Sequence, residues 1–363
     1  MNILVYLGHP AQYHFFKHTI HRLKKDGHKV RVLIKTKDIL EQLLQEDGLE
    51  YKNIQGTIRK NTKWGILSAS LKRTWAVYHE ARDFNADILT GTDASIAQAA
   101  WLLRKPSVTT LEDDVEIISN LARLTYPFTS DILVPTVCKV GKWEQKKIGY
   151  LGYMKLAYLH PNCFHPDKAI IKKYGIQDKF LLIRLAKLSA HHDNGIKGID
   201  TKLVDQILNI ANERGFQVFI SSESDIKEDL RPYQLAIRHT DIHHLMAFAS
   251  LLISDSQSMS VEAAMLGTPN LRFSDFSGRI SVLEELEHRY GLTKGIKTDE
   301  PQRLITEVNE LLSKDSTEEF KERRKKMLSD KIDVTSFMTW FLENYPASRQ
   351  MMKDNPTYQL TFR

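Results

Sequence analysis

Short apolar runs alternate with longer amphipathic stretches along most of the chain. Runs such as NILVYL (residues 2–7) and FLLIRL (residues 180–185) have the length and continuous hydrophobicity of buried strands. Between such runs, apolar residues recur at helical spacing, as in residues 12–25 and 202–213. Strands that alternate with helices predict an α/β fold in which parallel sheets are covered by helices on both faces.

This alternation is interrupted at residues 152–176, a stretch with two prolines and no clear period. The 363 residues are enough for two ordinary cores. We therefore predict two Rossmann-like, doubly wound domains that face each other across a cleft. Their expected bounds are residues 1–155 and 156–345, followed by a C-terminal tail at residues 346–363. In such sheets ligands bind beyond the carboxyl ends of the strands, so the loops after strands are the places to search.

Composition narrows the class of protein. Hydrophobic residues make up 42% of the chain and charged residues 26%, as in a folded globular protein. No apolar run has the length of a membrane span, and the first residues read as a strand and not as a secretory signal. The two cysteines form no metal or redox motif, so we expect a cytoplasmic protein with reduced thiols.

The net charge of +6 comes from the N-terminal half. Up to residue 160 there are 23 Lys and Arg against 16 Asp and Glu. These charges are scattered and not interleaved with aromatic residues, which argues against nucleic-acid binding. They fit either a solvated surface or a face that contacts anionic lipid or an acidic acceptor at the inner face of the cell membrane.

The most informative segment is LLISDSQSMSVEAAMLGTP, residues 251–269. A buried strand, a hydroxyl-rich turn and the start of a helix follow one another, and a helix N-terminus with free backbone N–H groups attracts phosphate. Ser256, Gln257 and Ser258 are the candidate phosphate contacts, and Glu262, one turn into the helix, suits the paired hydroxyls of a ribose. The alternative is that a serine here only caps the helix.

Loops after strands of the first half also carry candidate chemistry. Gly8 and His9 follow the first strand, with His14 shortly after, and either histidine is a candidate general base or substrate contact. This loop has one glycine where a dinucleotide fingerprint has three, so NAD and FAD are disfavoured. Asp93, Glu112 and Asp113 follow later strands and are candidates for proton transfer, although acidic turns also cap helices.

The second half adds histidines and an arginine. Arg184 ends its first strand, and His191 and His192 follow in a loop without the further ligands of a zinc site. We expect these three residues to contact substrate or phosphate and expect no metal. His243 and His244 open a helix and cannot share a face, so at least one of them has a structural role; His243 is the candidate ligand contact.

The motif of residues 255–269 resembles the signature of hydrolysing UDP-N-acetylglucosamine 2-epimerases and related GT-B glycosyltransferases. The similar residues are Asp255-Ser256-Gln257-Ser258, Glu262-Ala263 and Leu266-Gly267-Thr268-Pro269. More closely, pieces spread over residues 1–270, among them LEDDVE and SAHHDNG, resemble a bacterial and archaeal family of uncharacterised proteins described as predicted glycosyltransferases. This chain departs from the epimerase pattern where Gln257 and Ser258 replace paired glycines and His192 replaces an arginine.

The resemblance implies a GT-B fold with a nucleotide-sugar, expected to be UDP-linked, as substrate and no separate cofactor. It places Ser256, Gln257 and Ser258 on the phosphates, Glu262 on the ribose and His191 near the phosphates. Asp93 and either Glu112 or Asp113 correspond to epimerase carboxylates.

Three functions follow from this resemblance. The first is a metal-independent glycosyltransferase that modifies a lipid-linked or saccharide acceptor in cell-surface polysaccharide or glycolipid synthesis. The second is an isomerase similar to UDP-N-acetylhexosamine 2-epimerase. The third is a non-catalytic nucleotide-sugar-binding protein.

Overall fold

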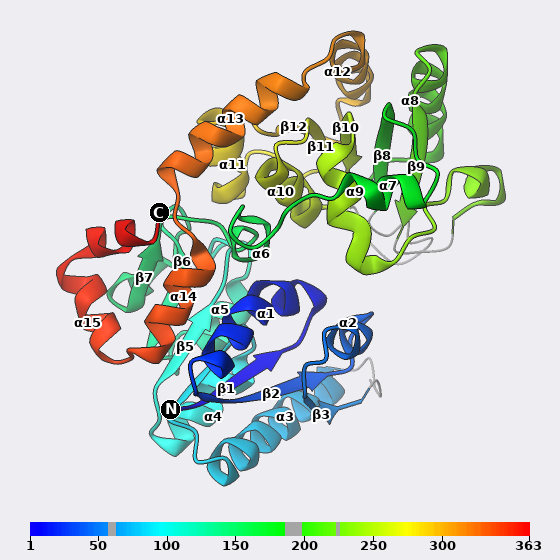
Figure 1. Ribbon diagram of the computed structural model, residues 1–363. Coiled ribbons are helices and arrows are strands. Elements are labelled where there is room, and N and C mark those ends of the chain that lie inside the picture. Colours follow the sequence, from blue (N-terminus) through cyan, green and yellow to red (C-terminus); the bar gives the residue numbers. More distant parts are fainter. Residues whose placement is uncertain (57–62, 186–197, 223–225) are drawn as a thin grey trace. The chain divides into compact units, whose positions relative to one another are not determined.

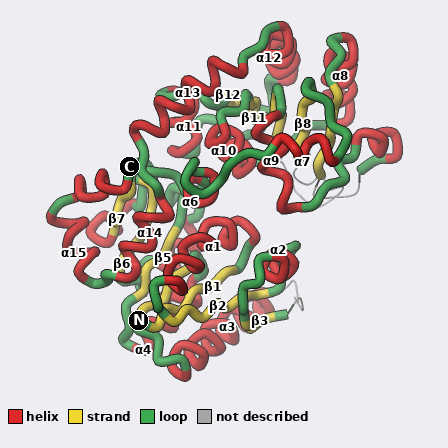
Figure 2. Tube along the Cα trace, viewed as in Figure 1, coloured by secondary structure: helices red, strands yellow, loops and turns green. Residues whose placement is uncertain are grey.

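The computed structural model describes residues 1–56, 63–185, 198–222 and 226–363. They form two compact units. Unit 1 comprises residues 1–163 and 331–363, and unit 2 comprises residues 164–330. Each contains a parallel sheet with helices around it, shown by the yellow strands and red helices of Figure 2. The predicted pair of doubly wound parallel-sheet domains is therefore confirmed.

The sheet of unit 1 has seven strands in the order β3-β2-β1-β4-β5-β6-β7. The strands are β1 (Asn2–Leu7), β2 (Lys29–Lys35), β3 (Lys52–Gln55), β4 (Ile88–Gly91), β5 (Ser107–Thr110), β6 (Asp131–Pro135) and β7 (Lys147–Tyr150). β2 and β3 are added on one side of β1, and β4 to β7 are added on its other side. The strand order therefore reverses between β1 and β4. Ligands of doubly wound sheets bind at such a reversal, at the carboxyl ends of the strands.

Helices cover both faces of this sheet. α1 (Pro10–Lys25) and α2 (Leu40–Glu46) lie on one face, and α3 (Lys63–Asp83) and α4 (Ala94–Leu103) lie on the other (Figure 1). α5 (Ser119–Thr125) packs against α4, and α6 (Leu156–Leu159) packs against α1. Residues 3–7 of β1 are fully buried between the two layers, as expected for a continuously apolar strand.

The sheet of unit 2 has five strands in the order β12-β11-β10-β8-β9. The strands are β8 (Phe180–Leu185), β9 (Gln217–Ser222), β10 (Leu251–Ser254), β11 (Asn270–Phe273) and β12 (Lys294–Ile296). The helices are α7 (Lys168–Lys173), α8 (Thr201–Glu213), α9 (Ile242–Phe248), α10 (Gln257–Leu266), α11 (Ser281–His288), α12 (Pro301–Ser313) and α13 (Thr317–Asp330). Here the strand order reverses between β8 and β10, which places the turn before α10 at the reversal.

The compact units differ from the predicted domain bounds at the C-terminus. The chain passes to unit 2 after Cys163 and returns to unit 1 at Lys331. α14 (Val334–Glu343) packs against α1 and α6, and Thr335 donates a hydrogen bond of 2.5 Å to the carbonyl of Ala157. α15 (Ala347–Asp354), placed in a tail by the sequence, contacts β7. The buried face of α14 is apolar, and its burial returns this helix to unit 1. α15 is held there by polar contacts as well, since Arg349 pairs with Asp131 of β6.

Short 3₁₀ helices complete the described elements: η1 (Gly141–Lys146), η2 (Glu228–Tyr233), η3 (His239–Asp241) and η4 (Pro356–Phe362). No helix in the described part of the chain is both long and apolar enough to cross a membrane.

Candidate functional site

The turn between β10 and α10 has the structure that its sequence predicts. Ser256 is the N-cap residue of α10, and its hydroxyl accepts a hydrogen bond of 3.5 Å from the backbone N–H of Met259. Its own N–H donates to the hydroxyl of Ser254 at the end of β10 (2.8 Å). Ser258 is exposed in the first turn. Ser256 therefore caps the helix, and its hydroxyl lies at the positive end of the α10 dipole.

Gln257, the first residue of α10, is held by two residues that the sequence analysis did not single out. Its carbonyl oxygen accepts a hydrogen bond of 3.0 Å from Nη1 of Arg272, and its amide nitrogen donates to the hydroxyl of Ser274 (2.7 Å). Arg272 lies on β11 and is fully buried. An arginine between Leu271 and Phe273 in a strand-like run is the one sequence signal that indicates such a role, because a buried guanidinium needs partners.

The positive charge of Arg272 lies near two carboxylates, at the upper limit of ion-pair distance. Glu284 and Glu287 each lie 3.9 Å from its Nη2 atom. Burial lowers the pKa of Arg272, and the two glutamates act in the opposite direction. Burial likewise raises the pKa of Glu287, which accepts a hydrogen bond of 2.9 Å from the N–H of Gly295. This buried network fixes the side chain of Gln257 at the start of α10.

Glu262 and His243 lie together on neighbouring helices. Nε2 of His243 is 3.4 Å from Oε1 of Glu262, and both side chains are nearly buried, with 8% and 12% of their surface exposed. His244, which follows His243 in the sequence, accepts a hydrogen bond of 3.0 Å from the backbone N–H of Asp167 and so has a structural contact. The predicted ribose contact, Glu262, is thus placed one turn inside α10 beside an imidazole.

The remaining candidates of unit 2 are at the end of β8. Nη1 of Arg184 donates a hydrogen bond of 2.7 Å to the hydroxyl of Ser221 on the neighbouring strand β9. His191 and His192 fall within residues 186–197 and lie outside the described residues.

In unit 1 a side chain of α1 joins the loops after β1 and β4. Gln12 accepts a hydrogen bond of 2.6 Å from the N–H of Gly8, and its amide nitrogen donates to the hydroxyl of Thr92. Gln12 is a residue that the sequence analysis missed. These two hydrogen bonds link the loops at the point where the strand order reverses. A ligand of this sheet would bind at that point.

The two histidines after β1 have different surroundings. His9 is exposed and is the N-cap residue of α1, where its Nδ1 accepts a hydrogen bond of 3.2 Å from Ala11. The ring of His14 lies between those of Tyr13 and Tyr158, with centroid distances of 5.1 and 5.2 Å. Tyr158 belongs to α6, so this helix forms one wall of the His14 environment.

Of the three candidate carboxylates, two are held in internal contacts. Asp93 caps α4 through the N–H of Ser95 (3.0 Å) and pairs with Nε of Arg73 (3.1 Å). Glu112 is buried, lies 2.5 Å from Nζ of Lys155 and accepts a hydrogen bond of 2.6 Å from the N–H of Met154. These contacts occupy the carboxylate oxygens of Asp93 and Glu112.

Asp113 differs from its neighbours. Burial raises the pKa of its carboxyl group, the charge of Glu112 raises it further, and Lys155 acts in the opposite direction. Within the described residues this carboxylate accepts no hydrogen bond. A half-buried carboxylate with a raised pKa is the usual form of a general base. Glu112 and His14 both contact the segment of α6, Glu112 through Lys155 just before the helix and His14 through Tyr158 on it.

No cluster of three or more His, Cys, Asp or Glu side chains in the described ranges could hold a metal ion.

The fold is shared with solved structures of low sequence identity. UDP-GlcNAc 2-epimerase of Neisseria meningitidis, bound to UDP-GlcNAc, has a TM-score of 0.67 and 16% identity, with 94% of this chain and 99% of that chain covered. The Methanocaldococcus jannaschii UDP-GlcNAc 2-epimerase, in complex with UDP-GlcNAc and UDP, has a TM-score of 0.62 and 16% identity, with 91% and 99% covered. The glycosyltransferase of kitacinnamycin has a TM-score of 0.61 and 13% identity, with 94% and 98% covered.

These similarities confirm the predicted GT-B type of fold. No curated protein is significantly similar to the chain in sequence. A family model does match, over residues 1–334, and its members are described as proteins of unknown function. The chain therefore belongs to this family, DUF354.

Proposed function

We propose that the protein is a glycosyltransferase with a nucleotide-sugar donor. Unit 2 binds the donor at the N-terminus of α10. The diphosphate accepts hydrogen bonds from the backbone N–H groups of the first turn and from the hydroxyl of Ser256, and the helix dipole favours its charge. Glu262 accepts hydrogen bonds from the ribose hydroxyls. The nucleotide is UDP, the ligand named with two of the similar structures.

Unit 1 supplies the general base, Asp113. In the inverting form of the reaction its carboxylate accepts the proton of the acceptor hydroxyl as that oxygen bonds to the anomeric carbon. The bond from this carbon to the diphosphate breaks, and the nucleoside diphosphate leaves with the electron pair. The positive end of α10 stabilises the departing charge without requiring a metal ion.

One observation carries the choice of transfer over epimerisation. Epimerisation of the sugar needs several carboxylates for proton transfer, whereas Asp93 is paired with Arg73 and Glu112 with Lys155. Of the three candidate carboxylates, Asp113 is the one that is left, and one base is enough for an inverting transfer. The isomerase stays the second candidate, because two similar structures are UDP-GlcNAc 2-epimerases. A non-catalytic nucleotide-sugar-binding protein is the third.

The acceptor that we propose is lipid-linked or a saccharide at the inner face of the cell membrane, in the synthesis of surface polysaccharide or glycolipid. The support is a set of exposed apolar side chains on three helices that pack together. We call it the aromatic face: its exposed residues are Leu71 and Trp75 on α3, Trp101 and Leu102 on α4, and Leu124 on α5. Hydrogen bonds from Thr74 to Gln98 (2.9 Å) and from Gln98 to the carbonyl of Leu124 (3.0 Å) join these helices.

The charges around the aromatic face favour an anionic lipid surface as its partner. Lys72, Arg104 and Arg123 are exposed on or next to the same helices. In the described part of α3, α4 and α5 the exposed acidic residue is Asp83, which pairs with Arg82 (2.9 Å). Two copies of this face would repel each other, whereas tryptophan beside cations suits the headgroup region of an anionic membrane.

The decisive experiment follows the fate of the sugar. The purified protein is incubated with UDP-, GDP-, CMP- and dTDP-sugars, with and without membrane extract, and products are followed by NMR. We expect nucleotide release that depends on the extract, and binding of the UDP donor weakened by about 1–3 kcal/mol in Glu262→Ala. Epimerised sugar without any acceptor would establish the isomerase instead. Binding without turnover under either condition would establish the non-catalytic function.

A further inference from the structure

Unit 2 contains a cavity of about 810 Å³ at the amino ends of its strands. Phe180, Ser250 and Pro269, which stand at or next to the starts of β8, β10 and β11, line it. Ser256 follows the carboxyl end of β10, so the cavity lies at the opposite edge of the sheet from the proposed donor site. A volume of this size is typical of small-molecule sites. Nothing in the proposed function uses it.

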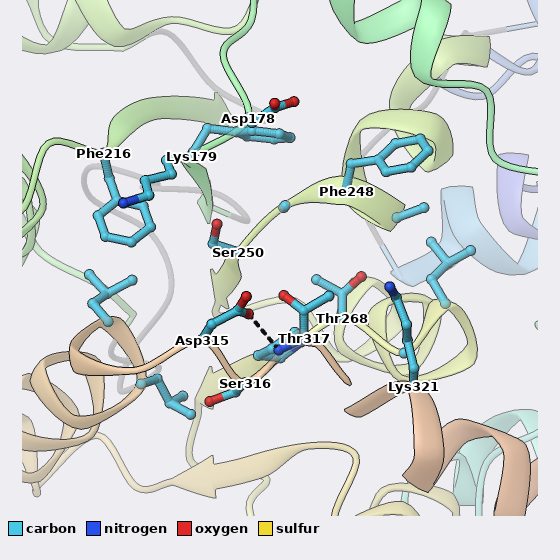
Figure 3. Close-up of a pocket in the computed structure, with 18 of the residues that line it drawn as sticks. Asp178, Lys179, Phe216, Phe248, Ser250, Thr268, Asp315, Ser316, Thr317 and Lys321 are labelled. Atoms are coloured by element: carbon cyan, nitrogen blue, oxygen red, sulfur yellow. Dashed lines mark hydrogen bonds between the residues drawn. The ribbon is translucent and has the colours of Figure 1, made fainter. Parts of the chain in front are cut away.

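The walls of the cavity combine aromatic and basic side chains. Phe216 and Phe248 lie on opposite sides of the view in Figure 3, with Ser250 between them. The charged lining consists of six basic residues and two acidic residues: Lys168, Lys179, Arg214, Lys314, Lys321, Arg324, Asp178 and Asp315. The lining therefore carries a clear excess of positive charge beside apolar surface.

Both acidic residues already have partners within the protein. Asp178 pairs with Lys168 at 2.8 Å. Asp315 accepts a hydrogen bond of 3.0 Å from the N–H of Thr317, the dashed line in Figure 3. The side chain of Thr317 and, to a smaller extent, this N–H lower the pKa of Asp315. Of the basic residues, Lys321 pairs with Glu318 on its own helix at 2.6 Å. The excess charge is thus not balanced by the acids of the lining.

The contacts of Arg324 indicate that the ligand of this cavity is an anion. It crosses from α13 to the end of α10, where its Nε donates a hydrogen bond of 2.5 Å to the carbonyl of Met265. This capping contact uses one of its five N–H groups. In the described ranges its Nη1 and Nη2 form no hydrogen bond, and no carboxylate there pairs with it. Burial lowers the pKa of Arg324 with no opposing contribution, as expected for a partly desolvated charge that lacks a counter-charge.

We propose that this cavity binds a small organic anion with an apolar body, whose phosphate or carboxylate group pairs with Arg324 while the body packs against Phe248. A planar guanidinium with two free nitrogens suits either group, because both accept paired hydrogen bonds. The other lysines of the lining raise the local positive potential. The site is independent of the proposed transferase activity.

The test uses the full chain and a fluorescent amphipathic anion, 8-anilinonaphthalene-1-sulfonate. We expect saturable binding at one site that salt weakens, and no binding of the neutral analogue N-phenyl-1-naphthylamine. Decanoate and uridine monophosphate are then added as competitors. Displacement by decanoate alone assigns an acyl carboxylate, and displacement by uridine monophosphate alone assigns a nucleoside phosphate. Failure of both to displace the probe would overturn the proposal.

Variants locate the site. Arg324→Gln is expected to weaken probe binding by about tenfold or more, the scale of lost charge-assisted hydrogen bonds. Because Arg324 also packs on α10, Lys321→Gln provides a second, exposed change and should weaken binding several-fold. Its matched control is Lys325→Gln, since Lys325 is exposed on the same helix and pairs with a glutamate in the same way, but does not line the cavity. Unchanged affinity in Arg324→Gln, or equal effects of Lys321→Gln and Lys325→Gln, would contradict this site.

Discussion

Neighbouring carboxylates in one loop have different chemistry because their contacts differ. Glu112 is buried against Lys155 and a backbone N–H, whereas Asp113 has its pKa raised by burial and by Glu112 itself. The sequence identifies both as candidates but does not separate them, since Lys155 is 43 residues away along the chain. Long-range contacts of this kind decide which acid can act as a base.

This difference gives a prediction about pH. A base works deprotonated, so transfer is lost as the pH falls through the raised pKa of Asp113, and the acid limb lies above the range of an ordinary aspartate. Asp113→Asn should lower kcat by about 10²–10⁴. Glu112→Gln removes a negative charge and should move the acid limb to lower pH while activity remains. The pH profile of kcat/KM measures both. Complete loss of activity in Glu112→Gln would instead make Glu112 the base.

The buried arginine beside Gln257 gives a second prediction. Arg272→Met removes the donor that holds the Gln257 side chain at the start of α10. We expect UDP binding to weaken by about 1–2 kcal/mol, the scale of a hydrogen bond to a charged group. Calorimetric titration checks this.

A double-mutant cycle supplies the control. If Arg272 acts through Gln257, the combined variant Arg272→Met/Gln257→Ala should bind UDP no worse than Gln257→Ala alone. Additive losses would show that Arg272 acts on the site by another route.

At the scale of elements, α10 shows what the sequence could and could not predict. A strand, a serine cap and a helix that Gly267 ends are all found, and Gly267 has the positive φ of 73° that favours glycine there. The partners of Gln257 and Glu262 come from β11 and α9. Local patterns specify caps and turns, but side chains that meet from different elements are set by the packing of the whole unit.

The aromatic face is an element-scale feature that can be tested directly. Trp75→Ala and Trp101→Ala together should reduce binding to vesicles that contain phosphatidylglycerol, because exposed tryptophans contribute interfacial affinity. Binding should also fall with added salt and be weak on neutral phosphatidylcholine vesicles. Co-sedimentation measures these effects.

The control for this face is Met351→Ala, an exposed apolar residue on α15. It should leave vesicle binding unchanged. Equal binding by the double tryptophan variant and the unaltered protein would remove the proposed membrane contact.

At the scale of the molecule, the two doubly wound units follow from the alternation of strands and helices, and the sequence predicts them correctly. The periodic pattern of residues 333–342 also predicts the helix that is seen as α14. The pattern does not say which core the apolar side of that helix joins. Arg22 of α1 donates a hydrogen bond of 2.6 Å to Ser336, a contact across 314 residues of chain. Such a return to unit 1 leaves no local signal in the sequence.

The return of the chain to unit 1 also gives a prediction about stability. Asp131 begins β6 and is fully buried, and its two oxygens are satisfied by the C-terminal segment: Nε of Arg349 at 2.7 Å and the hydroxyl of Tyr345 at 2.7 Å. Arg349→Met leaves this buried carboxylate without its cation, so the free energy of unfolding should fall by about 1–3 kcal/mol. Lys353→Met, which alters an exposed hydrogen bond on the same helix, should cost less than about 0.5 kcal/mol. Chemical denaturation followed by circular dichroism compares the two, and equal losses would mean that the C-terminal segment does not stabilise unit 1 through Asp131.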